Sequence, residues 1–221
     1  MKDNKANGKG RLIYPESDVY DGNWLDDKAE GKGIYTYQDG SKYDGEWKND
    51  LQNGYGVEQW SDGSRYEGNF KEGKKSGNGY FTWADGSSYK GEFVENNIEG
   101  RGIYGWDDGR KYEGTWKENK MSGKGVFTWG DGRKYEGDYV EDRKQGYGVF
   151  DWYNLTFYHS RPDGNKYEGQ WNNGKQDGRG FYTNKKGEKI EGLWNNGKRT
   201  KWITEPETKE SPAHNENDNN V

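Results

Sequence analysis

The chain contains no cysteine, only two histidines and only four prolines in 221 residues. The absence of cysteine excludes a disulfide framework, a thiolate zinc site and a cysteine nucleophile. Aliphatic residues are scarce as well, because hydrophobic residues of all kinds make up 27% of the chain and aromatic residues alone make up 16%. The share of the chain left for aliphatic residues is too small for a helical bundle or a doubly wound α/β core. No apolar run approaches the ~18 residues that a membrane-spanning helix needs.

Glycine and the large aromatic residues are abundant, with 36 glycines, 11 tryptophans and 18 tyrosines. A charged content of 33% would by itself be typical of a disordered chain, but the aromatic content argues against that class. The net charge of -5 does not indicate a nucleic-acid-binding surface. Residues 1–7 form a polar arm without the apolar stretch of a secretion signal. We therefore expect a cytoplasmic protein.

A strict repeat organises the sequence. The tripeptide Tyr-x-Gly returns at intervals of 23 residues, apart from one interval of 32 that exceeds the period by nine. The repeats begin at Tyr20, Tyr43, Tyr66, Tyr89, Tyr112, Tyr135 and Tyr167, and Ile190 takes the place of tyrosine in the last unit. We number positions within a repeat from this tyrosine. The predicted repeat region spans residues 8–203, from a half repeat at Gly8 to a terminal cap strand that begins at Ile190.

Each unit has the pattern of a β-hairpin. Positions 1 to 6 alternate between aromatic and polar residues, and position 8 is always Gly, Asn or Asp, which tolerate a positive φ. The second segment ends in Asp-Gly in most units, which is a strong hairpin signal. The predicted fold class is all-β, an elongated single-layer antiparallel β-meander of 23-residue hairpin repeats. Counting the half repeat, seven full repeats and the cap strand predicts sixteen strands.

Strand alternation assigns the side chains to two faces. Positions 1, 3, 5, 14, 16 and 18 share one face, which carries the tyrosines, glycines and wide aromatic residues. Glycine at positions 3 and 14 leaves room for a neighbouring ring to lie on the backbone. The other face carries an acidic stripe at position 2, interrupted by Lys90, and a basic stripe at position 23. We interpret the two stripes as a solvated ladder of weak ion pairs.

The pattern Tyr112-x-Gly114-x-Trp116, followed by Gly-x-Gly and Asp-Gly within each 23-residue unit, resembles the MORN (membrane occupation and recognition nexus) repeat. The resemblance implies an elongated β-meander with an aromatic groove. It also implies a stand-alone scaffold protein, with the radial spoke head type as the nearest comparison, and hence a place in a cytoskeletal or ciliary axonemal assembly. The resemblance covers about residues 8–202.

The leading functional hypothesis is a non-enzymatic scaffold that binds protein partners through the aromatic–glycine groove and that can self-associate through its open end strands. The expected partner-binding residues are the wide aromatic residues at positions 5 and 18: Trp47, Trp60, Phe70, Trp83, Phe93, Trp106, Trp116, Trp129, Trp152 and Trp171. The alternative is a peripheral module that binds phosphoinositides or anionic membranes through position 23.

We expect no enzyme, cofactor or metal site. His159 and His214 lie outside the repeats and lack a Ser, Cys or metal-ligand partner at a meaningful spacing. The carboxylates follow the structural period, whereas an active site breaks symmetry.

Residues 153–161 are the nine residues that lengthen one interval. They are either a hairpin loop that projects apolar side chains such as Leu155 and Phe157 toward a partner, or the translation of an unspliced intron. The second possibility arises because one permitted codon choice across Trp152 to Arg161 contains a stretch that begins with GT and ends with AG. Residues 204–221 form an acidic tail that we expect to be disordered.

Overall fold

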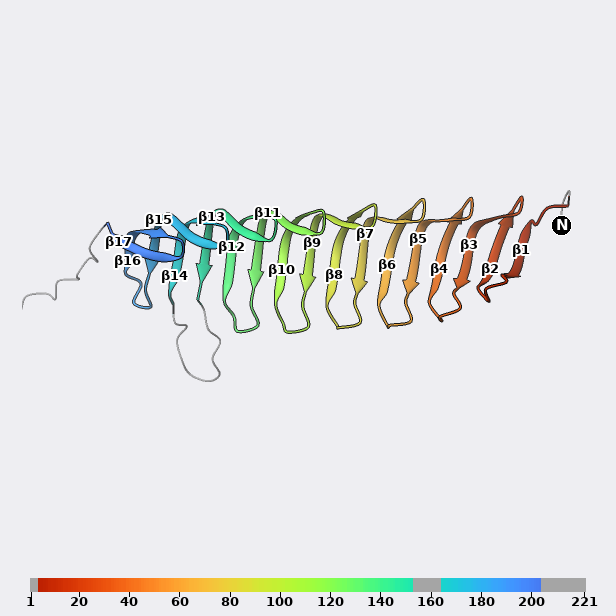
Figure 1. The fold of residues 1–221 in the computed structure, drawn as a ribbon, viewed down its shortest axis with the longest axis horizontal. Coiled ribbons are helices and arrows are strands. Elements are labelled where there is room, and N and C mark those ends of the chain that lie inside the picture. Colours follow the sequence, from red (N-terminus) through yellow and green to blue (C-terminus); the bar gives the residue numbers. More distant parts are fainter. Residues whose placement is uncertain (1–3, 153–163, 204–221) are drawn as a thin grey trace, which may run out of the picture.

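The computed structural model describes residues 4–152 and 164–203, and every regular element in these ranges is a β-strand. The strands form one antiparallel sheet in which each strand pairs with its neighbours in sequence (Figure 1). This arrangement confirms the predicted all-β single-layer meander. The insertion at 153–161 and the tail at 204–221 lie outside the described residues, although the strands on either side of the insertion pair with each other.

The strands and their bounds are β1 (Gly8–Ile13), β2 (Val19–Leu25), β3 (Lys28–Thr36), β4 (Lys42–Lys48), β5 (Leu51–Gln59), β6 (Arg65–Lys71), β7 (Lys74–Thr82), β8 (Ser88–Val94), β9 (Asn97–Gly105), β10 (Lys111–Lys117), β11 (Lys120–Thr128), β12 (Lys134–Val140), β13 (Arg143–Asp151), β14 (Lys166–Asn172), β15 (Lys175–Thr183), β16 (Lys189–Asn195) and β17 (Lys198–Trp202).

The predicted count of sixteen strands is wrong, because the described residues contain seventeen. The last unit forms a hairpin of β16 and β17, not a single cap strand. Asn196 and Gly197 supply two consecutive positive φ angles of 50° and 84° for its turn. Trp202 then packs edge-on against Trp194, with ring centroids 5.9 Å apart. This turn and ring contact complete the strand pair even though Lys201 stands where the pattern expects glycine.

The turn at positions 7 and 8 has a positive φ at both residues, as in Asn49 (49°) and Asp50 (67°). This is the backbone signature of a type I′ hairpin turn, and it confirms the prediction for position 8. Position 8 also ties neighbouring repeats together, because the Asp50 carboxylate accepts a hydrogen bond of 2.7 Å from the backbone N–H of Ala29. Asn96, Asn119 and Asp142 accept the equivalent bond in later repeats.

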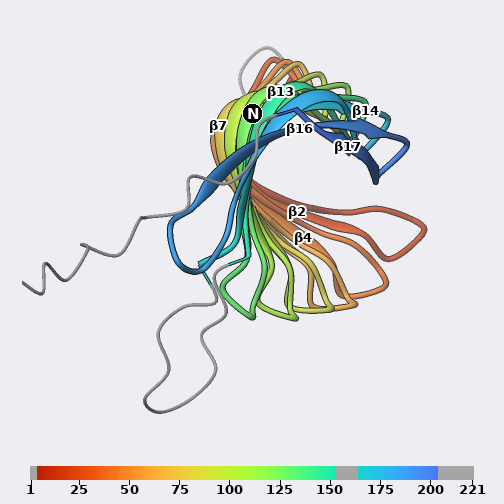
Figure 2. The ribbon, with the colours of Figure 1, turned by 90° about the vertical axis from the view of Figure 1, so that its left-hand side faces the viewer.

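A bulge bends each repeat in the middle. In all seven full repeats the pairing register shifts just after the glycine at position 3. The glycine at position 12 lies opposite this shift and has φ between 63° and 93°, a conformation that favours glycine. Figure 2 shows the result: each hairpin is bent, and successive repeats are rotated about the long axis of the sheet.

The core of the sheet is a ladder of tyrosines and wide aromatic residues. The tyrosine at position 1 is 0–1% exposed in every full repeat, and its ring lies over the glycines at positions 3 and 14. Its hydroxyl donates to a backbone carbonyl, as from Tyr66 to Asn69 at 3.0 Å. The ring at position 5 packs edge-on against two tyrosines, so that Phe70 lies 5.0 Å from Tyr43 and 5.1 Å from Tyr66. The predicted packing of rings on glycines is confirmed.

Candidate functional site

A second row of aromatic residues runs beside this ladder on the same face. Rings at positions 16 and 18 alternate along it, with centroid distances of 5.2 Å from Trp60 to Phe81 and 4.5 Å from Phe81 to Trp83. The contacts continue at 4.5–5.3 Å as far as Trp152. We call the position-18 residues Trp60, Trp83, Trp106, Trp129 and Trp152 the tryptophan row. Each of them is half-buried, so each keeps part of its ring in contact with solvent.

The ten predicted partner-binding residues separate into two groups of different accessibility. The five at position 5 are only 3–9% exposed because they fill the tyrosine ladder; they are Trp47, Phe70, Phe93, Trp116 and Trp171. The five at position 18 are the tryptophan row. Strand alternation places both groups on one face, but only the row offers ring surface that a partner could cover.

Cations lie over the tryptophan row. The guanidinium groups of Arg110 and Arg133 lie 5.2 Å and 5.6 Å from the rings of Trp106 and Trp129. Such contacts hold a ring in place and add a positive charge beside it. Each guanidinium also pairs with an aspartate, Arg110 with Asp108 at 2.7 Å and Arg133 with Asp131 at 2.8 Å, so the middle of the row combines aromatic rings with paired charges.

Two lysines at position 10 lie among these rings in different electrostatic surroundings. The Lys75 ammonium lies 4.7 Å from the ring of Trp60 and forms a largely buried ion pair of 2.8 Å with Glu58. The Lys144 ammonium lies 4.6–4.9 Å from four ring centroids, and within the described ranges it has no carboxylate partner. Burial, with a smaller contribution from Arg133, lowers the pKa of Lys144 to about 8.

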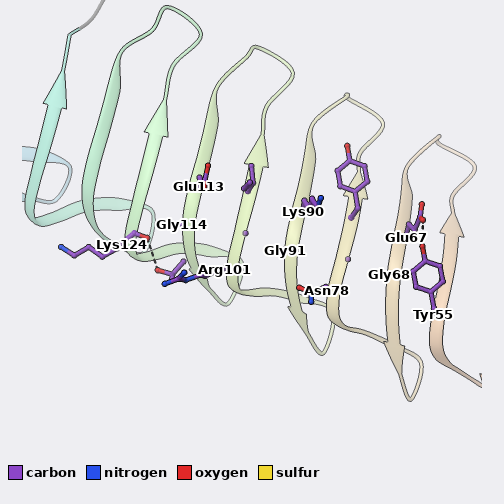
Figure 3. A pocket seen from close by; sticks show the side chains of 15 residues that line it. Tyr55, Glu67, Gly68, Asn78, Lys90, Gly91, Arg101, Glu113, Gly114 and Lys124 are labelled. Atoms are coloured by element: carbon purple, nitrogen blue, oxygen red, sulfur yellow. Dashed lines mark hydrogen bonds between the residues drawn. The ribbon is translucent and has the colours of Figure 1, made fainter. Parts of the chain in front are cut away.

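The opposite face contains a hollow with a volume of about 950 Å³ that reaches from β5 to β11 (Figure 3). The backbone of the glycines at positions 3 and 14 contributes to its lining, and side chains from positions 2, 13 and 15 surround it. Tyr80 and Ile103 are 42% and 37% exposed there. We call this feature the polar-face hollow. Sequence reasoning did not find it; the available signal was Lys90, the one break in the acidic stripe.

The charge ladder predicted for this face is present. The position-23 cation pairs with the position-2 carboxylate at 3.0 Å between Lys111 and Glu113 and at 2.8 Å between Lys134 and Glu136. The Lys134 ammonium lowers the pKa of Glu136 by hydrogen bonding to it. All four side chains are largely exposed, so each pair contributes well under ~1 kcal/mol to stability.

No three His, Cys, Asp or Glu residues gather into a possible metal site in the part of the chain that the structure describes. The same residues include no helix of the length and apolarity needed to cross a membrane. His159 and His214 both fall outside the described ranges.

Comparison with protein families gives one result. The model of the MORN repeat matches eight consecutive segments, at residues 1–19, 20–42, 43–65, 66–88, 89–109, 112–132, 135–156 and 167–189. These segments follow the 23-residue period and together cover most of the chain. No curated protein sequence matches the chain.

Solved structures give only distant matches. The TCP domain of Drosophila melanogaster SAS-4 (dCPAP), solved with a proline-rich motif of Ana2, is 10% identical, with 84% of this chain and 90% of that chain covered and a TM-score of 0.46. The TCP10 domain of Danio rerio CPAP is 13% identical, with 90% of each chain covered and a TM-score of 0.46. A virginiamycin B lyase of Staphylococcus aureus is 11% identical over 86% of this chain and 85% of that chain, with a TM-score of 0.21. Matches this distant identify no partner or activity.

Proposed function

Because the chain belongs to the MORN repeat family, we propose that it is a non-enzymatic scaffold whose tryptophan row binds a segment of a partner protein. One observation carries this proposal: a row of half-buried tryptophans continues across five repeats on a single-layer sheet. A single layer has no second sheet to cover these rings. Wide aromatic residues that keep accessible surface are the residue type most enriched at the centres of protein interfaces.

The partner of this proposal is an extended or helical protein segment within a cytoskeletal or ciliary assembly. The cellular setting comes from the family resemblance alone. Among the assemblies that this resemblance suggests, a radial spoke head is the nearest comparison.

Self-association through the end strands is the weaker part of the predicted partner set. Edge strand β1 carries Lys9 and Arg11, and edge strand β17 carries Lys198, Arg199 and Lys201. Cations on both edges repel one another, and lysine on an edge is a common device against edge-to-edge pairing. The proposal therefore assigns binding to the face of the sheet.

The alternative of an anionic-membrane module also loses support. That alternative requires the position-23 cations to contact the lipid. However, Arg65, Lys111 and Lys134 each pair with a neighbouring carboxylate at 2.6–3.0 Å. Paired charges leave little net positive potential for a lipid headgroup.

The proposal is tested by replacing Trp83, Trp106 and Trp129 together with leucine, which keeps apolar volume but removes the wide rings. The matched control replaces Tyr147 and Phe181, which are 51% and 37% exposed on the opposite face, also with leucine. Each tagged variant replaces the endogenous protein, and its partners are quantified by affinity capture and mass spectrometry after circular dichroism has verified the fold. We expect the tryptophan variant to lose a defined set of partners that the control keeps. Retention of the full set by a folded tryptophan variant would refute the proposal.

A further inference from the structure

The charge ladder of the polar face is interrupted at one repeat. In the repeats on either side, position 23 and position 2 hold an ion pair, Arg65 with Glu67 at 2.6 Å and Lys111 with Glu113 at 3.0 Å. In the repeat between them the same positions hold Ser88 and Lys90. The carboxylate is thus replaced by a cation, and the cation that would pair with it is replaced by a small neutral residue.

This interruption lies in the middle of the polar-face hollow, as Figure 3 shows for Lys90 between Glu67 and Glu113. Across the neighbouring strands Lys90 lies opposite Tyr80 and Ile103. Arg101 lies on β9, two residues from Ile103, so its side chain reaches the same space.

Both of these cations are available for a ligand. Lys90 and Arg101 are exposed, and neither forms an ion pair within residues 4–152 and 164–203. The carboxylate of Glu92 accepts a hydrogen bond from the backbone N–H of Arg101 at 2.9 Å. Glu67 is held by Arg65 and by the hydroxyl of Tyr55.

We propose that the polar-face hollow binds an extended acidic protein segment, whose carboxylates lie on Lys90 and Arg101 and whose apolar side chains lie against Tyr80 and Ile103. This inference rests on the proposed scaffold function and adds a second docking face to it. The occupant has to be acidic because the two central cations are unpaired, and apolar in part because the exposed side chains between them are Tyr80 and Ile103.

The dimensions fit a peptide strand. The hollow reaches from β5 to β11, which are six strand spacings or about 29 Å apart. An extended segment of about nine residues covers that length. A flat anionic membrane fits less well, because the carboxylates of Glu67 and Glu113 flank the two cations on either side (Figure 3).

The repeat itself provides the test variant. Ser88→Lys combined with Lys90→Glu rewrites this repeat with the residues that its neighbours carry, so the fold is expected to tolerate it. The control combines Lys134→Glu with Glu136→Lys, which reverses an ion pair of the same ladder outside the lining of the hollow and leaves Lys90 and Arg101 in place. Lys90→Gln provides a second test variant that removes the charge with little change in size. Circular dichroism checks that all three fold.

The probe is a phage-displayed library of random 12-residue peptides, selected against the full wild-type chain at physiological salt. Enriched peptides are synthesised, and their affinities for all variants are measured by fluorescence anisotropy. We expect enriched peptides to share an Asp or Glu next to an apolar residue. We expect binding to the Ser88→Lys/Lys90→Glu variant to fall by about tenfold or more, because charge-assisted contacts are lost and a repulsion is added. The Lys134/Glu136 control is expected to change affinity by less than about threefold.

Other outcomes overturn the inference and separate it from the proposed function. Enrichment of peptides without acidic residues would overturn the inference. So would peptides whose binding survives the Ser88/Lys90 exchange but is lost with the Trp83/Trp106/Trp129 variant. Either result would leave the tryptophan row as the docking face and the hollow without a role. Failure to enrich any peptide would contradict both. Flotation of the chain with vesicles containing phosphatidylinositol bisphosphate, abolished by the Ser88/Lys90 exchange, would identify a membrane as the occupant instead.

Discussion

Gly102→Ala should destabilise the protein strongly, whereas Gly105→Ala, on the same strand β9, should not. A Cβ atom at residue 102 would lie well inside contact distance of the Tyr89 ring and hydroxyl. Tyr89 is 0% exposed and its hydroxyl donates to the carbonyl of Glu92 at 3.2 Å. At residue 105 the nearest atom is the Ser88 hydroxyl at 3.5 Å, an ordinary contact.

The magnitude follows from what the Tyr89 ring would lose. Forcing a methyl group into a filled site costs about 1–3 kcal/mol, and displacing the ring would sacrifice about 2 kcal/mol of burial and about 1 kcal/mol of hydrogen bonding. We expect Gly102→Ala to lower the free energy of unfolding by about 3 kcal/mol. We expect Gly105→Ala to leave it unchanged or to raise it by about 0.5 kcal/mol, because alanine loses less backbone entropy on folding.

Urea denaturation followed by circular dichroism and tryptophan fluorescence compares the two variants. Unfolding of repeat arrays can depart from two-state behaviour, so the comparison uses the midpoint as well as the fitted free energy. Equal effects of the two substitutions would refute the packing of tyrosine on glycine as the source of stability in this sheet.

Three further predictions concern charges and turns. Glu118 has a φ of 50° in a type I′ turn, so Glu118→Asn should raise the urea midpoint by the equivalent of about 0.5 kcal/mol; a lower midpoint would contradict the turn assignment. Glu58→Gln leaves the Lys75 ammonium without its ion-pair partner and should cost about 2–3 kcal/mol, and adding Lys75→Met should restore most of the loss in the same assay. Lys144 has a pKa of about 8 in the folded chain and about 10.4 in the unfolded chain. Between these two pH values the unfolded chain binds more protons than the folded chain. The free energy of unfolding therefore rises by up to about 3 kcal/mol as pH increases through this window. Thermal melts at pH 7.5 and 9.5 should show this gain for the wild type relative to Lys144→Met; parallel pH profiles of the two proteins would show that Lys144 is not desolvated.

The period and the alternation of residue types were enough to predict the meander, the two faces and the packing of rings on glycines. They could not separate position 5 from position 18, because alternation gives the face of a side chain but not its depth. That depth follows from contacts between repeats, since Phe70 is covered by the tyrosines of two units. The sequence pattern also failed to predict β17, because Lys201 stands where the repeat has glycine. This strand nevertheless pairs with β16 through a regular turn and the contact of Trp202 with Trp194.

The polar-face hollow was beyond sequence reasoning for a related reason. Lys90 is visible in the sequence as an exception, but its environment depends on which side chains the sheet places opposite it. Tyr80 and Ile103 come from the neighbouring strands, and the spaces above the position-3 and position-14 glycines join only when several repeats stack.

Hydroxyl-radical footprinting of the protein in its native assembly tests the central claim most directly, because it reports which face a partner covers. Oxidation of each tryptophan, tyrosine and phenylalanine is quantified by mass spectrometry in the assembly and in the isolated chain. The account predicts strong protection of Trp83, Trp106 and Trp129 in the assembly, with Tyr147 and Phe181 oxidised equally in both samples. Unchanged oxidation of the tryptophan row in a partner-bound assembly would contradict the account.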